Sequence, residues 1–292
     1  MMLVYIESPE PGVRSFNRII ANLKYYAPSH VEFVTEEKQA DVVIVHVNGR
    51  FNRAQTQAAR AVSRRQKYVV NQYCLRSTME PHTAVWRELW DHAAMVWSYY
   101  NLDGCIREDL GTGVIKNFYR SPLGVDGKLF SPDPDSNPSY IIGMSGGGPM
   151  VEGVREAVYA SQNVGKQLFH LGPLQFGPNV TAVENVPDAD LRHWYSRCTY
   201  FGGLRRKEGF EMCCAEALAC GVRPIFYDRI HYRQWFDEFA LFIPEGTRDE
   251  VVSSLETIFT HDPVPVTEDE RQAALRKFNW ATICREYWSR CL

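Results

Sequence analysis

The alternation of short apolar runs with segments of helical periodicity restricts the fold of this chain more than any other feature. Val42–Val45 is a continuous apolar run, which is expected of a parallel strand covered on both faces. Val13–Tyr26 has apolar residues at helical spacing and lies between two further apolar runs, Leu3–Glu7 and Val31–Thr35. Strand and helix in turn predict an α/β fold with parallel, doubly wound sheets.

Residues 51–66 have a helical pattern and continue the alternation in the first half. The same alternation begins again in the second half, where a strand at Tyr140–Met144 is followed by Gly146–Gly148 and a helix at Val151–Ser161. Between the halves, Ser131–Pro138 holds three prolines among polar residues, which is typical of a linker. With 292 residues, the chain is long enough for two ordinary domains. Further strands are predicted within Lys67–Tyr73, Ala94–Ser98, Gln167–Leu171, Val180–Val183, Cys198–Phe201 and Arg223–Tyr227.

Composition excludes several classes of protein. The formal net charge is −3, so the whole protein is no polycation, and no apolar run approaches the ~18 residues of a membrane span. The chain starts with too short an apolar run for a signal peptide, and we expect a strand there. Its eight cysteines lack metal-ligand spacing, and Asp133-Pro134-Asp135 lies in the linker, where we expect it to be solvated. These features predict a cytoplasmic protein with reduced thiols and no required metal.

One segment, residues 201–224, has the composition of a binding site for a phosphorylated ligand. Three cations, Arg205, Arg206 and Lys207, directly precede Glu208. Glu216 follows inside an apolar run of helical character that ends at Cys220-Gly221. Cations and free backbone N–H groups at a helix start favour an anion there. One carboxylate would then face the head of a ligand and the other its middle, with the phosphates between them.

This string resembles the donor-binding motif of the retaining GT-B glycosyltransferases of the large GT4-type family, in which a Glu, seven residues and a second Glu precede a small-residue stretch ending in Cys-Gly. Gly124–Pro132 is similar to the segment before the second domain of that family, and Phe278–Trp280 is similar to part of its C-terminal helix. The resemblance implies two Rossmann-like domains that face each other across a cleft. It places an acceptor-side domain at 1–134, a nucleotide-sugar domain at 135–276 and a helix that crosses back at 277–292. An ordinary amphipathic helix with a glycine C-cap is the alternative.

The resemblance also implies roles for individual residues. Glu208 would be the catalytic carboxylate that hydrogen-bonds the transferred sugar, and Glu216 would bind the ribose hydroxyls. Such enzymes retain the anomeric configuration and let the leaving phosphate take the acceptor proton, so that catalysis rests on stabilising the departing diphosphate. The implied donor is a nucleotide sugar, with a UDP-sugar favoured, and no cofactor is required. The diphosphate would be held by Arg205, Lys207, Gly209, Phe210 and Glu211.

Two glycine-containing loops are also expected to face the donor, because ligands of open α/β sheets bind outside the carboxyl ends of the strands. Relatives usually carry an Arg and a Lys in the first loop of the second domain, but Ser145-Gly146-Gly147 has no cation. Its backbone N–H groups could form an anion nest instead, and a flexible turn is the alternative. In the loop after the first strand, Gly12 would allow a close approach to the phosphates, or belong to a plain turn.

His46 ends the third predicted strand and is the second candidate catalytic residue. The resemblance places it near the cleft, although a lone histidine is more often structural. Many relatives carry another histidine after the fourth strand, where this chain has Gln72-Tyr73. This departure weakens the case for a histidine-assisted step.

The predicted helix at 51–66 suggests what the acceptor could be. At 3.6 residues per turn, four cations on this stretch, Arg53, Arg60, Arg64 and Lys67, would share one narrow face. A solvated face is the ordinary interpretation, and a surface that meets DNA or anionic lipid headgroups is the alternative. Membrane docking would favour exposed apolar residues beside the cations, and the stretch has only Phe51. We therefore favour DNA with a hydroxymethylated pyrimidine, flipped out of the duplex, as glycosylated by some viral enzymes.

Two other functions stay open. A lipid or cell-surface saccharide could be the acceptor. Alternatively, the chain could be a GT-B-fold protein that binds a nucleotide sugar without turnover, as the missing histidine and missing cation pair suggest. Glu208 and Glu216 favour the enzyme, and a viral enzyme would act in the cytoplasm of its host cell.

Overall fold

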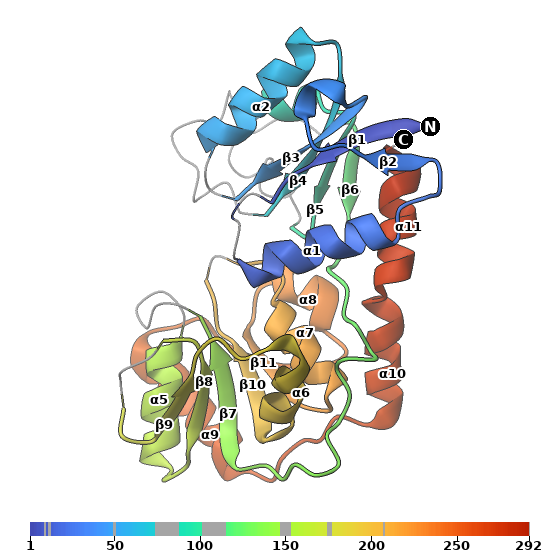
Figure 1. Cartoon of the computed structure of the whole chain (residues 1–292). Coiled ribbons are helices and arrows are strands. Elements are labelled where there is room, and N and C mark those ends of the chain that lie inside the picture. Colours follow the sequence, from blue (N-terminus) through green and yellow to red (C-terminus); the bar gives the residue numbers. More distant parts are fainter. Residues whose placement is uncertain are drawn as a thin grey trace. The chain divides into compact units, whose positions relative to one another are not determined.

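The computed structural model describes residues 1–8, 10, 13–48, 51–73, 88–100, 115–146, 153–173, 177–206 and 208–291. Contacts between Cα atoms divide the chain into two compact units (Figure 1). Unit 1 consists of Met1–Leu123 and Trp280–Leu292, and unit 2 of Gly124–Asn279. The proline-rich segment at 131–138 therefore lies within unit 2.

The described part of unit 1 contains a six-stranded parallel sheet with the order β2-β1-β3-β4-β5-β6. The chain steps from β1 to β2 in one direction and from β3 to β4 in the other, so right-handed connections place α1 and α2 on opposite faces. β3 is buried along its whole length, as its apolar run predicts. The elements are β1 (Met2–Ile6), α1 (Arg14–Tyr25), β2 (Val31–Phe33), the 3-10 helix η1 (Glu37–Gln39), β3 (Val42–Val47), α2 (Phe51–Ser63), β4 (Lys67–Gln72), β5 (Met95–Ser98), β6 (Phe118–Arg120) and α11 (Trp280–Cys291).

Helix α11 completes unit 1, although it is the last element of the chain. Tyr287 and Trp288 are fully buried. The Trp288 indole Nε1 donates a hydrogen bond to the Leu23 carbonyl at the end of α1 (2.9 Å). Two large aromatic side chains thus fasten the C-terminal helix to the first half of the sequence.

Unit 2 repeats the architecture, with a second described six-stranded parallel sheet of order β12-β11-β10-β7-β8-β9. Its strand order reverses at β7 and β10, which are neighbours although far apart in sequence. Its elements are β7 (Tyr140–Ser145), α5 (Val154–Asn163), β8 (Leu168–Leu171), β9 (Val180–Val183), α6 (Asp188–Ser196), β10 (Cys198–Gly203), α7 (Met212–Ala219), β11 (Arg223–Tyr227), α8 (Ile230–Phe236), β12 (Leu241–Ile243), α9 (Arg248–Thr260) and α10 (Glu268–Lys277). Two doubly wound parallel sheets confirm the predicted fold class.

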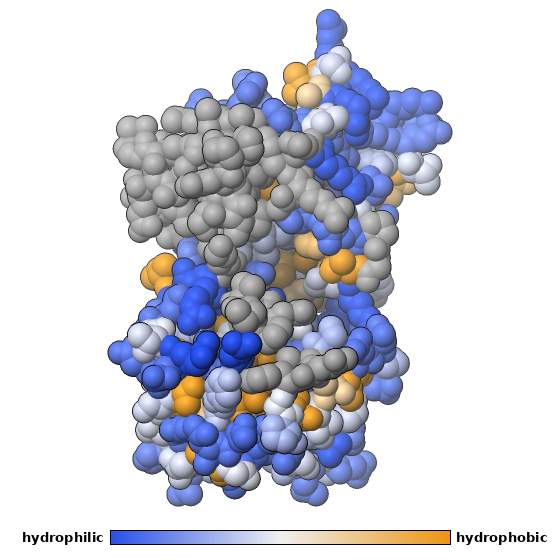
Figure 2. Space-filling model, turned by 90° about the vertical axis from the view of Figure 1, so that its left-hand side faces the viewer, coloured by the Kyte–Doolittle hydropathy of each residue, from blue (hydrophilic) through white to orange (hydrophobic). Residues whose placement is uncertain are grey.

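Local sequence explains how these elements begin and pack. Thr247 and Glu250 form a capping box at the start of α9, and Thr267 repeats it at α10, satisfying N–H groups that would otherwise lack partners. Within β10, a Cβ atom added to Gly203 would come within 2.2 Å of the Phe226 ring, so β10 and β11 pack closely only with glycine there. On the face shown in Figure 2, hydrophilic residues cover most of the described surface.

One predicted boundary is wrong. The helix expected at 51–66 ends at Ser63 as α2, because Arg65 adopts a left-handed conformation (φ 59°) that stops it. Lys67 begins β4 and therefore does not extend the cationic face of the helix.

Candidate functional site

The segment singled out in the sequence lies at the carboxyl edge of the unit 2 sheet. β10 ends at Gly203, and residues 204–211 connect it to α7. β7 runs beside β10 in parallel, with Met144 opposite Gly202, so Ser145 reaches the same edge. This is the reversal point of the strand order, where open α/β sheets bind their ligands.

Glu216 is a buried carboxylate in the middle of helix α7. It is 2% exposed, and its Oε2 accepts a hydrogen bond of 2.8 Å from the Tyr195 hydroxyl. Burial above all, followed by the electrostatic and hydrogen-bond contributions of Cys213 and Glu216, raises the pKa of Tyr195 well above its ordinary value, so Tyr195 remains a donor at physiological pH. Burial followed by the charge of Glu216 raises the pKa of the Cys213 thiol to about 11. The pair is thus a protonated phenol that orients a carboxylate.

Tyr195 was not found by sequence reasoning. It is on α6 and fully buried, and no motif connects it with Glu216. The available signal was a tyrosine at helical spacing from the apolar Leu191, which is also typical of an ordinary core residue.

Arg205 is engaged by protein groups at three points. Its Nε lies 3.1 Å from Glu211 Oε1 and its Nη1 lies 3.9 Å from Glu208 Oε1. Its Nη2 donates to the Ser145 carbonyl at 3.2 Å. The guanidinium thus ties the end of β7 to the loop before α7. The charge of Arg205, which was expected to meet a diphosphate, is therefore balanced within the loop.

The carboxylates around Arg205 differ in burial. Glu211 is 5% exposed, whereas about a third of the Glu208 side chain is exposed (34%). Glu211 occupies the N-cap position of α7 without a side-chain capping bond, because its carboxylate pairs with Arg205. Glu208 is therefore the more accessible of the two to a ligand.

The rest of the loop is anchored by side chains from β11, α8 and the segment that follows β12. The Arg206 guanidinium lies over the Tyr227 ring, 4.8 Å from its centroid, and its Nε is 3.2 Å from Glu245. The Tyr232 hydroxyl donates to the Arg205 carbonyl at 3.0 Å. Phe210 is buried against Phe236, with 5.2 Å between ring centroids. Gly209 lies in the same described loop, and Lys207 falls outside the described residues.

Part of the glycine-rich loop also falls outside the described residues. Ser145 is buried at the end of β7, and Gly146 follows with φ 133°, a conformation that favours glycine. Gly147 lies beyond the described part, as does Gly12 of unit 1. Where the chain is described again, a Cβ atom on Gly153 would lie 2.7 Å from Leu204 Cβ. The start of α5 therefore lies close to the loop after β10.

His46 lies near the carboxyl end of β3 in unit 1 and is 6% exposed. Its Nδ1 is 3.0 Å from the Tyr73 hydroxyl, and the two rings stack at 5.6 Å between centroids. Burial, with a smaller contribution from the Arg53 charge, lowers the pKa of His46 to about 3. The ring is therefore neutral at physiological pH. Tyr73, from the Gln72-Tyr73 step at the end of β4, is its direct partner.

Three of the four cations expected on the acceptor side form ion pairs. Arg53 pairs with Glu7 at 2.8 Å, and Arg60 and Arg64 both pair with Glu37, at 2.7 and 2.9 Å. The hydrogen bond from Arg60 is the largest influence that lowers the pKa of Glu37. The surface is thus less positive than the sequence suggests. The fourth cation, Lys67, is exposed at the start of β4.

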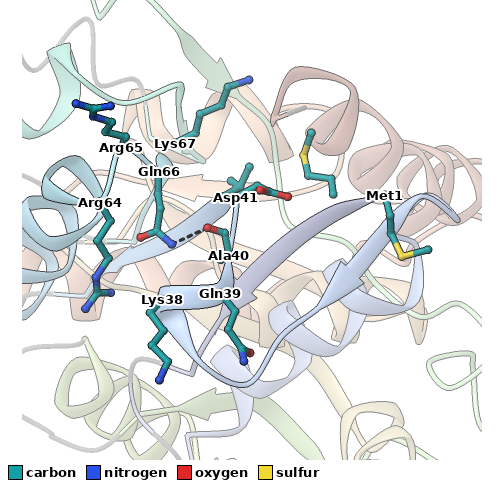
Figure 3. Close-up of a pocket in the computed structure, with 11 residues that line it drawn as sticks. Met1, Lys38, Gln39, Ala40, Asp41, Arg64, Arg65, Gln66 and Lys67 are labelled. Atoms are coloured by element: carbon teal, nitrogen blue, oxygen red, sulfur yellow. Dashed lines mark hydrogen bonds between the residues drawn. The ribbon is translucent and has the colours of Figure 1, made fainter.

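A hollow of about 760 Å³ lies near Lys67 but at the opposite edge of the sheet from His46. Residues at the starts of β1, β3 and β4 line it, among them Met2, Val42 and Lys67. Figure 3 shows Arg65 and Lys67 pointing away from Arg64 and Lys38, while Gln66 donates to the Ala40 carbonyl at 2.6 Å. The cations do not converge on one point, so the hollow lacks the geometry of a small-anion site.

No protein-family model and no curated protein sequence matches this chain, but solved structures do. HepE of Anabaena, solved in complex with UDP, is 14% identical over 99% of both chains, with a TM-score of 0.76. AviGT4, a glycosyltransferase involved in avilamycin A biosynthesis, is 13% identical over 100% of this chain and 97% of its own, with a TM-score of 0.66. The lipopolysaccharide outer core galactosyltransferase WaaB is 12% identical over 99% of both, with a TM-score of 0.66. The chain therefore has the predicted GT-B fold.

No group of three or more His, Cys, Asp or Glu side chains in the described ranges is arranged to hold a metal ion. Among the helices described, none combines the length and the apolar character needed to cross a bilayer.

Proposed function

We propose that this protein is a retaining glycosyltransferase of the GT4 type, which transfers a sugar from a nucleotide-sugar donor to a hydroxyl acceptor. The observation that carries the proposal is the buried Glu216 carboxylate, oriented by Tyr195 inside a helix whose preceding loop presents Glu208. The Tyr195 hydrogen bond offsets the cost of burying this carboxylate and fixes its orientation, and a carboxylate fixed in this way suits a ligand with hydroxyl groups. The fold shared with HepE, a protein solved with UDP, supports the same function.

Each part of the donor then meets a distinct group. Glu216 accepts hydrogen bonds from the ribose hydroxyls, while Tyr195 fixes its rotamer. Glu208 contacts the hydroxyls of the transferred sugar. The diphosphate lies at the start of α7, where backbone N–H groups and the helix dipole favour an anion. Because Arg205 is held by Glu208 and Glu211, its main contribution is to position Glu208.

The reaction breaks the bond between the anomeric carbon and the phosphate oxygen, and forms a bond from that carbon to the acceptor oxygen on the same face. The departing phosphate oxygen takes the acceptor proton. Stabilising the charge on this phosphate lowers the barrier. We propose a UDP-sugar as donor and no required metal, so EDTA should leave the rate unchanged.

The acceptor is the least constrained part of the proposal. The ion pairs of Arg53, Arg60 and Arg64 weaken the electrostatic case for DNA, which favours a lipid or saccharide hydroxyl as the second acceptor to test. Oligonucleotides with hydroxymethylated pyrimidines and saccharide or lipid acceptors should be incubated in parallel with a panel of nucleotide sugars. Mass spectrometry identifies the product, and NMR of its anomeric proton tests retention. A DNA acceptor would also bind less tightly as salt rises.

Calorimetric titration with UDP tests the donor site directly. We expect Glu216→Gln to weaken UDP binding about tenfold or more, because it removes a charged hydrogen-bond acceptor worth about 1.5–3 kcal/mol. Glu256→Gln, on α9 and hydrogen-bonded to Asn163, is the matched control and should bind as the wild type does. Equal UDP affinity in all three proteins would refute the donor site. UDP binding without hydrolysis or transfer, across all donors and acceptors, would instead favour a non-catalytic binding protein.

A further inference from the structure

Four buried side chains of unit 1 form a continuous chain of hydrogen bonds that ends at His46. Tyr287 on α11 donates to Asn71 Oδ1 at 3.0 Å. Asn71 Nδ2 lies 3.3 Å from the Tyr73 hydroxyl, which is 3.0 Å from His46 Nδ1. None of the four residues is more than 6% exposed. His46 Nε2 is also buried and has no hydrogen-bond partner among the residues that the structure describes.

The number of protons on these four side chains decides in which direction the hydrogen bonds between them run. If Tyr287 donates to Asn71, the Asn71 amide donates to Tyr73, and Tyr73 donates to His46 Nδ1, then each hydroxyl proton has an acceptor. The ring proton of the neutral histidine must then be on Nε2. In the reverse direction, the Tyr287 hydroxyl proton has no acceptor among the described residues, whereas Nε2 lacks a protein partner in both directions. A buried polar group without a partner costs about 1–3 kcal/mol, so the first direction is favoured.

We propose that this hydrogen-bond chain fixes His46 as a neutral imidazole with its proton on Nε2, and that the Nε2–H donates to a hydroxyl oxygen of the bound substrate. The substrate part rests on the proposed function. His46 is then a binding residue near the carboxyl end of β3, and Tyr73, Asn71 and Tyr287 are positioning residues. An Nε2 that already carries a proton does not act as a general base, so His46 orients the substrate rather than accepting a proton.

The location of the four residues supports a positioning role. His46 and Asn71 are directly opposite each other in the register of β3 and β4, and Tyr73 follows β4 at the carboxyl edge, where ligands of such sheets bind. Packing holds the Tyr73 ring independently of its hydroxyl, because it contacts the rings of Phe16 and Trp97 at centroid distances of 5.1 and 6.1 Å. Tyr73→Phe should therefore fold and remove only the hydroxyl from the chain.

The first measurement identifies the protonated ring nitrogen by ¹⁵N-detected NMR of the labelled full-length protein near pH 7. We expect the His46 proton on Nε2 in the wild type, and a shift toward Nδ1 in Tyr73→Phe. Tyr287→Phe, at the far end, should give a mixture of the two tautomers because Asn71 is then free to reverse. Tyr119→Phe is the matched control. It removes the Tyr119 hydroxyl, which lies 3.0 Å from Glu286, a residue of the helix α11 that also carries Tyr287. The hydrogen bonds from Tyr287 to His46 are untouched, so the wild-type tautomer should persist.

The second measurement is kcat/KM for the donor hydrolysed in the UDP-sugar panel. Loss of one hydrogen bond to the substrate should lower kcat/KM about three- to tenfold in Tyr73→Phe, and less in Tyr287→Phe, with Tyr119→Phe within twofold of the wild type. His46→Gln, which keeps a neutral N–H donor, should retain more activity than His46→Ala.

The two measurements separate the inference from the proposed function. A wild-type His46 that is charged, or protonated on Nδ1, would overturn the inference whatever the activity. The expected tautomer with unchanged kcat/KM in Tyr73→Phe would overturn the substrate contact. If no UDP-sugar is bound or turned over, the proposed function fails while the tautomer assignment is still tested by NMR.

Discussion

The carboxyl edges of the two sheets carry different kinds of polar groups. In unit 2 the groups are charged, and Arg205, Glu208 and Glu211 contact one another within one short segment. In unit 1 the buried groups are neutral, and His46 and Tyr73 are joined to Tyr287 from the other end of the chain, while the Arg53–Glu7 ion pair is about half exposed (44% and 47%). One edge is a set of ion pairs formed locally, and the other is a chain of hydrogen bonds assembled by the fold.

The difference shows how each kind of site becomes visible in a sequence. Charges removed from water need partners, and a loop at a helix start supplies these partners from nearby residues, so the site appears as a compact motif. A neutral network needs only matched donors and acceptors, and these come from any strands and helices that pack together. Its members look like ordinary core residues until the fold is known.

The largest expected effect separates the two carboxylates of the charged edge. Glu208→Ala should lower kcat about 100- to 1,000-fold, as expected when a group acting in the transition state is removed, while UDP affinity stays within about twofold. Glu216→Ala should mainly weaken UDP binding. Donor affinity and turnover unchanged in both variants would refute the roles given to the motif.

Breaking the local ion pair tests whether the charged edge depends on internal pairing. Arg205→Met leaves the nearly buried Glu211 without its cation, and we expect the free energy of unfolding to fall by about 3 kcal/mol. The measurement is urea unfolding monitored by circular dichroism. Arg206→Met is the matched control, because Arg206 and its partner Glu245 are each about a third exposed (32% and 31%), and such pairs contribute less than about 1 kcal/mol. Equal losses in the two variants would contradict the pairing.

The sequence predicted what depends on local pattern. Three features each depend on residues that are close together in the sequence: the apolar run of β3, the strand–helix alternation and the segment around Glu208 and Glu216. The two sheets follow from the first two. The end of α2 was predicted wrongly because the left-handed Arg65 has no glycine or proline to mark it. The same error made Lys67 appear to be part of a helical face.

Residues brought together by the fold could not be predicted. Glu37 lies before β3, whereas Arg60 is on α2 and Arg64 directly follows α2. The ion pairs that neutralise these two cations therefore cannot be read from the sequence of residues 51–66. Tyr195 and Tyr287 reach their polar partners from separate helices. Their hydroxyls distinguish them from core residues, but a tyrosine in an apolar pattern gives no indication of which group it meets.

A smaller loss of UDP affinity is expected when the neutral donor of unit 2, the Tyr195 hydroxyl, is removed. Tyr195→Phe keeps the buried ring and removes the hydrogen bond to Glu216, so UDP affinity should fall about three- to tenfold and stability by about 1–2 kcal/mol. Tyr68→Phe removes a comparable buried hydroxyl, which donates to the Leu89 carbonyl in unit 1 at 2.8 Å. This control should lose similar stability and no UDP affinity. If both variants lost UDP affinity, the loss would reflect general destabilisation and not the orientation of Glu216.

The most gradual expected effect is the pH dependence that His46 imposes on the free energy of unfolding. Burial lowers the pKa of His46 to about 3 in the folded protein, whereas an unfolded histidine has a pKa of about 6.5. The stabilising contribution is fully present above pH 6.5 and is lost as pH falls toward 3, because only the unfolded chain binds the proton in that window. His46→Gln removes this loss, so the stability difference between wild type and variant should change by up to about 1.4 kcal/mol per pH unit below about pH 6.

His231 in unit 2 provides the comparison for this measurement. Burial, followed by the charge of Arg229, lowers its pKa to about 4, so its stabilising contribution is also lost as pH falls below 6.5. Urea unfolding at a series of pH values should therefore give parallel slopes for His46→Gln and His231→Gln between about pH 6 and 4. If the difference in free energy of unfolding between wild type and His46→Gln did not change with pH across this range, His46 would be protonated in the folded protein. The buried group of unit 1 would then be charged and not neutral.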